Sequence, residues 1–138
     1  MSMSRAHAWG PVILFMGLIF WSSSIPGTPP SPPGEPEKDD FVSIICRYFD
    51  KPIHATVYAG LAALVMRALT LRGITWRRAA GVALLICLAF GAGDEWHQSF
   101  VLYRESSLDD WIADAIGAFG MILLISRRHL RKPVFSLP

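Results

Sequence analysis

The chain has 138 residues, of which 52% are hydrophobic and only 17% are charged. Its mean hydropathy of +0.37 is high for so short a chain, because a small soluble domain does not need that much apolar surface to fill its core. The composition therefore argues against a soluble globular protein and predicts an integral membrane protein with a single domain, residues 1–138. The formal net charge of +2 says little about partners, whereas the placement of the charges along the chain is informative.

Four apolar segments predict an all-α protein, a bundle of four transmembrane helices. With their adjoining polar residues these segments cover about 8–25, 52–71, 77–98 and 108–126, close to the roughly 20 residues that a span needs. Three of the apolar runs are shorter than that on their own, so we expect their polar ends to be helical and partly inserted. A cleaved signal peptide is an alternative for the first segment, because Arg5 precedes it and small residues, Ser22–Ser24, follow it.

Basic and acidic residues fall on opposite sides of this predicted bundle. If the N-terminus is cytoplasmic, all 11 acidic residues lie on the outer side. The inner side then holds nine of the 13 Lys and Arg residues, namely Arg5, Arg67, Arg72, Arg77, Arg78, Arg127, Arg128, Arg131 and Lys132. Because Lys and Arg in short loops favour the cytoplasm, we predict that both termini are cytoplasmic and that the outer face is polar and acidic.

A Pro-rich segment separates the first two spans. Residues 26–40 cannot form a regular helix or strand and predict an extended extracytoplasmic linker. Apolar residues at helical spacing follow it, which predicts a short interfacial helix over residues 41–50, before the second span. Pro52 would then occupy the first turn of a new helix.

Polar and ionisable residues gather at the outer ends of three predicted spans and in the connection between the last two. They are Lys51, His54 and Tyr58 on the second span, Asp94, His97 and Gln98 on one face of the third with Glu95 at its edge, Arg104 in the connection, and Asp110 and Asp114 on the fourth. Charges at membrane depth are costly and normally face the bundle interior, paired with one another. The stripes therefore predict one polar pocket, in which Arg104 pairs with Asp110 or Asp114.

Two classes of function suit such a pocket. In an enzyme, Glu95 or Asp94 would act with His54 or His97 in general acid–base catalysis. Lys51 and Arg104 would hold the phosphate or carboxylate of an anionic ligand. The candidate substrate-binding residues are Lys51, Arg104, Gln98, Asp110, Asp114 and Tyr58. In a non-catalytic membrane subunit, the same charged cluster would hold the helices together or dock a partner protein.

Metal and nucleic-acid binding are weaker interpretations. His54, His97, Asp94 and Asp114 are residue types that zinc or manganese accepts. No His-Glu-x-x-His or comparable spacing is present, so we assign no metal ligands, and the sequence does not identify a cofactor. The basic residues flank the spans without forming a basic, aromatic groove, so we expect no nucleic-acid partner.

Residues 94–120, "DEWHQSFVLYRESSLDDWIADAIGAFG", resemble the VanZ-like family. The residues in register with its pattern are Asp94, Glu95, Gln98, Arg104, Asp110, Asp114 and Gly117. The family's Lys-x-x-His-x-x-x-Tyr element is matched by Lys51, His54 and Tyr58, and its Ser-Ser-x-Pro-Gly element by residues 23–27. Many members have Pro-Gly just before the Arg, where this chain has Leu102 and Tyr103, so we expect a differently shaped loop around Arg104.

The resemblance implies a multi-pass protein of the bacterial cytoplasmic membrane. The member that gave the family its name is associated with resistance to teicoplanin, a lipid-tailed glycopeptide antibiotic. The resemblance thus implies a role in envelope integrity or teicoplanin-type resistance. Membrane lipids or lipid-linked envelope precursors are the partners that this role implies.

Overall fold

The computed structural model describes residues 5–30, 33 and 41–130, and every regular element in this part is helical. A short 3-10 helix, η1 (Arg5–Ala8), precedes α1 (Gly10–Ser23), α2 (Phe41–Leu71), α3 (Trp76–Gln98) and α4 (Leu108–Leu130). The prediction of an all-α protein with four long helices is confirmed for this part of the chain. Most of the predicted linker 26–40, and Arg131 and Lys132 of the predicted inner side, lie outside the described residues.

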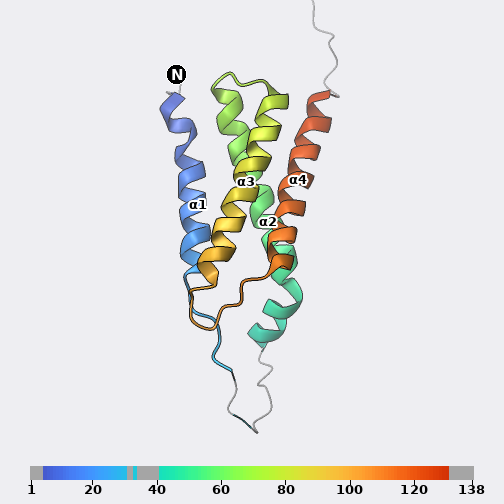
Figure 1. Ribbon diagram of the computed structural model, residues 1–138. Coiled ribbons are helices and arrows are strands. Elements are labelled where there is room, and N and C mark those ends of the chain that lie inside the picture. Colours follow the sequence, from blue (N-terminus) through green and yellow to red (C-terminus); the bar gives the residue numbers. More distant parts are fainter. Residues whose placement is uncertain (1–4, 31–32, 34–40, 131–138) are drawn as a thin grey trace, which may run out of the picture.

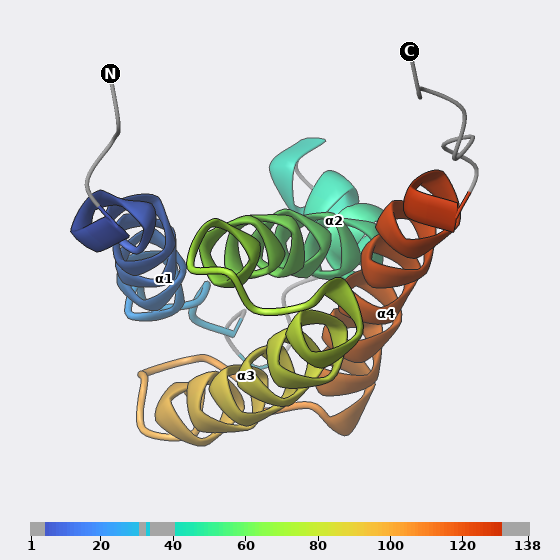
Figure 2. The same ribbon diagram turned by 90° about the horizontal axis from the view of Figure 1, so that it is seen from above.

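The four α helices run side by side as one bundle (Figures 1 and 2). We call the end at which α1 and α3 finish and α2 and α4 begin the linker end. The start of α1 and the finish of α4 are both at the opposite end, on different sides of the bundle (Figures 1 and 2). Helix α2 packs against all three of the others and supplies the fully buried side chains Tyr58, Leu61 and Val65. It is therefore the central helix of the bundle.

Two helices are long and apolar enough to cross a membrane. They cover Tyr48–Leu71 and Trp76–Gln98, and the shorter of them has 23 residues, or about 35 Å at 1.5 Å per residue. This length exceeds the roughly 30 Å of a hydrocarbon core. Helix α1 has 14 residues, fewer than the predicted span 8–25, and α4 is long but carries acidic residues in its first half.

The bundle is apolar outside and polar in part of its interior. Large side chains such as Ile13, Leu85 and Phe119 are more than half exposed. The four carboxylates Asp94, Glu95, Asp110 and Asp114 are each at most 7% exposed. This arrangement is the reverse of what water favours, and it is the one expected where lipid surrounds the helices. Together with the two apolar helices, it indicates a membrane protein.

Residues 41–50 are helical, but the prediction of a separate interfacial helix is wrong. Helix α2 runs without interruption from Phe41 to Leu71, and Pro52 lies inside it rather than in its first turn. Pro52 lacks the N–H that would bond to the carbonyl of Tyr48. The loss of one backbone bond does not end the helix, because the next turns are packed against α4. The first turns of α2 project beyond the other helices (Figure 1).

Helices α2 and α4 approach each other very closely at Gly117. A Cβ atom at this position would overlap the backbone carbonyl of Ala55. His54 is the neighbour of Ala55, and Asp114 lies about one turn before Gly117. The close contact therefore brings the imidazole of His54 and the carboxylate of Asp114 together.

We predict that Gly117→Ala destabilises the bundle, because the added methyl group forces α2 and α4 apart. Overpacking of this kind typically costs about 1–3 kcal/mol. Gly120→Ala is the matched control, since a Cβ at Gly120 meets nothing within 4 Å and alanine favours a helix. Thermal unfolding in detergent should show a lower Tm for Gly117→Ala alone. Equal Tm values for the two variants would contradict the close packing.

Candidate functional site

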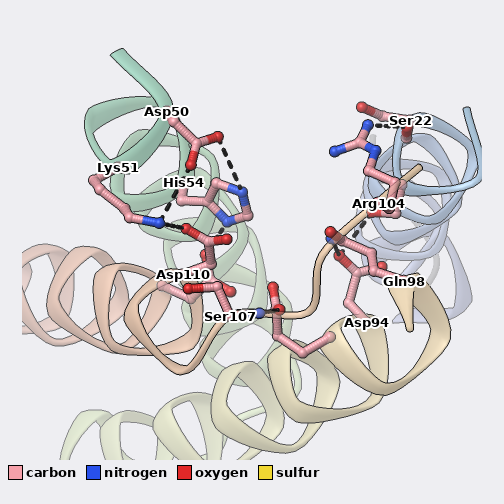
Figure 3. A network of polar contacts seen from close by, with 12 residues as sticks. Ser22, Asp50, Lys51, His54, Asp94, Gln98, Arg104, Ser107 and Asp110 are labelled. Atoms are coloured by element: carbon pink, nitrogen blue, oxygen red, sulfur yellow. Dashed lines mark hydrogen bonds and ion pairs between the residues drawn. The ribbon is translucent and has the colours of Figure 1, made fainter. Parts of the chain in front are cut away.

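The polar residues predicted from the sequence lie at the linker end, in two groups of contacts that face each other (Figure 3). The first group joins α2 to α4 through Asp50, Lys51, His54 and Asp110. The second joins α3 and the α3–α4 connection to the end of α1 through Asp94, Gln98, Arg104 and Ser22. Ser107 lies between them, at the start of α4.

His54 is at the centre of the first group. Its Nδ1 atom lies 2.9 Å from Oδ1 of Asp114, and its Nε2 atom lies 3.9 Å from Oδ1 of Asp50. The ammonium group of Lys51 donates to Asp110 and, at 3.3 Å, to Asp50. Lys51 and His54 lie about one turn apart on α2, and their partners Asp110 and Asp114 lie about one turn apart on α4. Two parallel contacts therefore join these helices.

Glu95 reaches the same group from α3. One of its carboxylate oxygens lies within 4.8 Å of a ring nitrogen of His54 and of an oxygen of Asp114. Its Oε2 atom accepts a hydrogen bond from the backbone N–H of Ser107 at 2.8 Å, which ties the end of α3 to the start of α4. The residues His54, Glu95 and Asp114 therefore form one compact cluster, which we call the acid–imidazole cluster.

Asp94 belongs to the second group, although it is the neighbour of Glu95. Its Oδ2 atom accepts hydrogen bonds from Ser23 Oγ at 2.7 Å and from Gln98 Nε2 at 3.2 Å. Asp94 is 4% exposed, and Ser23 lies in the last turn of α1. The carboxylate thus fixes the end of α1 to α3.

Arg104 binds backbone carbonyls, and the expected pairing with Asp110 or Asp114 is not found. Its Nε donates to the carbonyl of Ile25 at 3.1 Å and its Nη2 to the carbonyl of Ser22 at 3.2 Å. These carbonyls are at the C-terminal end of α1, where the helix dipole places partial negative charge. The α3–α4 connection holds Arg104 at this helix end, so the carbonyls satisfy a guanidinium that was expected to need a carboxylate.

His97 also faces α1. The sequence predicted His97 on the face of α3 that lines the pocket and Glu95 at the edge of this face, whereas in the structure Glu95 is on the buried face and His97 is beside it. The imidazole of His97 stacks on Phe20 at 4.2 Å between centroids, and its Nε2 lies 3.0 Å from Ser24 Oγ. The buried stripe of α3 is instead Gly91, Asp94, Glu95 and Gln98, at the spacing of one helix face. The four residues considered as metal ligands, His54, His97, Asp94 and Asp114, are consequently not brought together as one set.

Tyr58 lies deeper in the bundle, one turn beyond His54. It is 1% exposed, and its hydroxyl has no hydrogen-bond partner among the described residues. Its ring lies beside Gly91, next to Oδ2 of Asp114. Glycine at position 91 leaves the room that these two side chains occupy.

Two neighbouring pockets lie between the groups. The polar pocket has a volume of about 310 Å³ and is lined by Asp50, Lys51, His54, Gln98, Tyr103, Arg104, Glu105, Ser107 and Asp110. The amphipathic cleft, about 210 Å³, lies between α1, α2 and α3 and is lined by Phe15, Leu18, Ile19, Ser22, Ser23, Ile53, His54, Val57, Tyr58, Asp94, Gln98 and Arg104. Three residues, His54, Gln98 and Arg104, line both pockets. A charged pocket is thus adjacent to a largely apolar one.

The sequence analysis missed the part that the end of α1 plays. Its Ser-Ser-x-Pro-Gly element supplies the hydroxyls bound to Asp94 and His97. The N–H of Gly27 donates to the carbonyl of Leu102 at 3.0 Å, and a Cβ at Gly27 would overlap the carbonyl of Tyr103. In the sequence this element carries only a resemblance to the VanZ-like family. Its two serines and its glycine are the residues from which contacts of α1 with α3 and the α3–α4 connection could have been predicted.

The connection before Arg104 has a backbone conformation that favours glycine. Tyr103 has φ of +58°, in the left-handed region that bulky residues rarely adopt. Many VanZ-like proteins have glycine at this position. Tyr103 therefore adopts a backbone conformation that glycine also adopts. The φ angle of Tyr103 gives no support to the expectation of a differently shaped loop at this residue.

We predict that Arg104→Ala lowers the Tm in detergent, whereas Arg128→Ala at the opposite end of the bundle leaves it nearly unchanged. A hydrogen bond to a charged group contributes about 1.5–3 kcal/mol, and Arg104 makes two at the end of α1. Arg104→Lys should recover only part of the loss, because an ammonium lacks the planar fork. Asp114→Asn should not compensate, since Arg104 and Asp114 share no contact. If Asp114→Asn did compensate, the result would support the Arg104–Asp114 pairing that the sequence predicted and contradict the contacts described here.

The chain was compared with protein families, curated proteins and solved structures. The model of the VanZ/LLP1 family matches residues 8–130, which include all four α helices and both groups of the site. No curated protein and no solved structure matches the chain. Because the match covers most of the sequence, the chain belongs to the VanZ/LLP1 family.

Proposed function

We propose that this protein binds a membrane lipid with an anionic headgroup, such as a lipid-linked precursor of the cell envelope, at the linker end of the bundle. The observation that carries the proposal is that the polar pocket and the amphipathic cleft are neighbours, with His54, Gln98 and Arg104 lining both. A lipid has the same two parts, a charged headgroup and an apolar chain. Phe15, Leu18 and Val57 line the cleft where the chain would lie.

Lys51 and Arg104 are the groups that would hold the headgroup. Both line the polar pocket, and they come from opposite groups of the site. A guanidinium has five N–H donors, and the two bonds to α1 leave others for a ligand. The side chain of Lys51 is 47% exposed, and its ammonium group has a third donor besides those bound to Asp110 and Asp50. A phosphate between the two would receive charge-assisted hydrogen bonds from both sides.

The acid–imidazole cluster supplies groups for general acid–base catalysis next to this pocket. His54 lines both pockets and contacts Asp114, which can orient the imidazole as a proton acceptor or donor. Glu95 lies beside them and is the second candidate. Asp94 and His97, which the sequence suggested for the same role, are engaged with α1.

A purely structural role is the alternative, and the second group of contacts favours it for its own members. Asp94 and Arg104 bind the end of α1, as residues that hold a bundle together do. In that case the same end of the bundle would dock a partner protein. We therefore divide the polar residues into a structural half at α1, namely Asp94 and His97, and a functional half around His54. Arg104 belongs to both, because two of its donors bind α1 and the others remain for a ligand.

The proposal includes four membrane spans, both termini in the cytoplasm and the linker end outside. It is supported by the apolar exterior and by the basic residues of the α2–α3 turn and the end of α4, which lie at the opposite end from the site. Reporter fusions at Gly73 and after Pro138 should read cytoplasmic, and a fusion within residues 31–40 should read external. An external reading at Gly73 would reverse the orientation.

Lipid binding can be tested by native mass spectrometry of the purified protein in detergent. A polyprenyl phosphate should bind, and a diacylglycerol of similar size should not. Lys51→Gln should weaken binding of the phosphate about tenfold or more, because one charge-assisted bond is worth about 1.5–3 kcal/mol. Arg128→Gln, at the opposite end, is the matched control.

The same preparation separates an enzyme from a binding protein. Turnover of a lipid-linked precursor that is lost in Glu95→Gln, with binding retained, would indicate catalysis. Binding without turnover in the wild type would indicate a non-catalytic subunit. In cells, loss of the protein should raise sensitivity to teicoplanin, and Lys51→Gln should fail to restore resistance. Equal binding of polyprenyl phosphate and diacylglycerol would contradict the proposal.

A further inference from the structure

We propose that His54, Glu95 and Asp114 bind one divalent transition-metal ion, Zn²⁺ or Mn²⁺. This site does not rest on lipid binding by Lys51 and Arg104. A bound ion would make His54 and Glu95 ligands, in place of the acid–base role proposed for them above. Each residue offers one ligand atom, and the three atoms lie within 4.8 Å of one another. They come from three helices, α2, α3 and α4, so the fold rather than a local sequence motif assembles the set.

Unpartnered buried oxygens point to a missing ligand. Oδ2 of Asp114 and Oε1 of Glu95 have no hydrogen-bond partner among the described residues, although Asp114 is 2% and Glu95 6% exposed. The hydroxyl of Tyr58, 1% exposed, is also unpartnered, and both its ring and Oδ2 of Asp114 lie close to Gly91. Buried polar groups are nearly always satisfied, so these atoms need an explanation, as does Oδ1 of Asp94 in the second group.

The balance of charge favours a cation. Two buried carboxylates face one imidazole, while the nearest ammonium, that of Lys51, is paired with Asp110 and Asp50. A protonated His54 would compensate one carboxylate, whereas a divalent ion would compensate both. Asp50, His54 and Asp110 form a second possible set, but Lys51 already occupies it with a positive charge. The cluster with Glu95 is therefore the better site.

The ligand types select the metal. Imidazole nitrogen suits zinc, copper, iron and nickel, and carboxylate oxygen suits manganese, magnesium and calcium. One nitrogen with two carboxylates fits Zn²⁺ or Mn²⁺ better than Mg²⁺ or Ca²⁺, which prefer oxygen alone. Ligands about 2.1 Å from a tetrahedral ion are about 3.4 Å apart. The 2.9 Å contact of His54 with Asp114 would therefore open by about half an ångström.

The test is titration of the full-length protein in detergent with MnCl₂ or ZnCl₂ after treatment with EDTA. Calorimetry, and for manganese the loss of the free-ion EPR signal, should show one site per chain. Bound metal should also raise the Tm of the wild type. Asp114→Asn and Glu95→Gln should each weaken binding at least about tenfold, the lower limit seen when even an outer-shell partner of a metal site is lost.

Two exposed carboxylates provide matched controls. Glu105→Gln and Asp109→Asn remove the same charge from the α3–α4 connection and the first turn of α4, and both should bind metal as the wild type does. If one ligand variant fails to fold, the wild-type titration and the other variant still decide. Absence of binding by the folded wild type, or unchanged affinity in both ligand variants, would overturn the site whether or not a lipid binds.

Discussion

The close approach of α2 and α4 at Gly117 is the constraint on which the site depends. Because Gly117 has no side chain, the backbone of α4 reaches the carbonyl of Ala55. The neighbouring residues are then fixed in register, so His54 meets Asp114 at 2.9 Å and Lys51 meets Asp110. A larger residue would widen the gap between the helices, and both contacts would lengthen together. The glycine is thus as much a part of the site as the ionisable groups.

Four carboxylates can be buried in this bundle because hydrogen bonds and an ion pair offset the free-energy cost of removing them from water. Asp110 has Lys51, Asp94 has Ser23 and Gln98, and Glu95 has the N–H of Ser107. An isolated carboxylate in an apolar medium would cost far more, and it would normally take up a proton instead. The partners come from α1, α2, α3 and the residue just before α4, so the polar interior and the helix packing support each other. Compensation is incomplete in the acid–imidazole cluster, where Oε1 of Glu95 and Oδ2 of Asp114 have no partner among the described residues, and at Oδ1 of Asp94.

The sequence predicted the helices and the polar residues well, because both depend on local pattern. The third helix was expected at 77–98 and lies at Trp76–Gln98, and the fourth at 108–126 and lies at Leu108–Leu130. Partners across helices could not be predicted, because they depend on small rotations. A small rotation of α3 about its own axis is enough to put Glu95 inside the bundle in place of His97. Arg104 was assigned a carboxylate by charge alone, and backbone carbonyls at a helix end carry no signal in the sequence.

Helix α1 has two roles that act at different depths. At the linker end it is held by Arg104 through its carbonyls, by Asp94 through Ser23 and by the stacking of Phe20 on His97. Along its middle, Phe15, Leu18 and Ile19 form one wall of the amphipathic cleft. A lipid chain in this cleft would therefore lie against the middle of α1, while the polar contacts keep the end of α1 in place. These contacts would in this way fix the wall of the cleft next to His54, which lines both pockets.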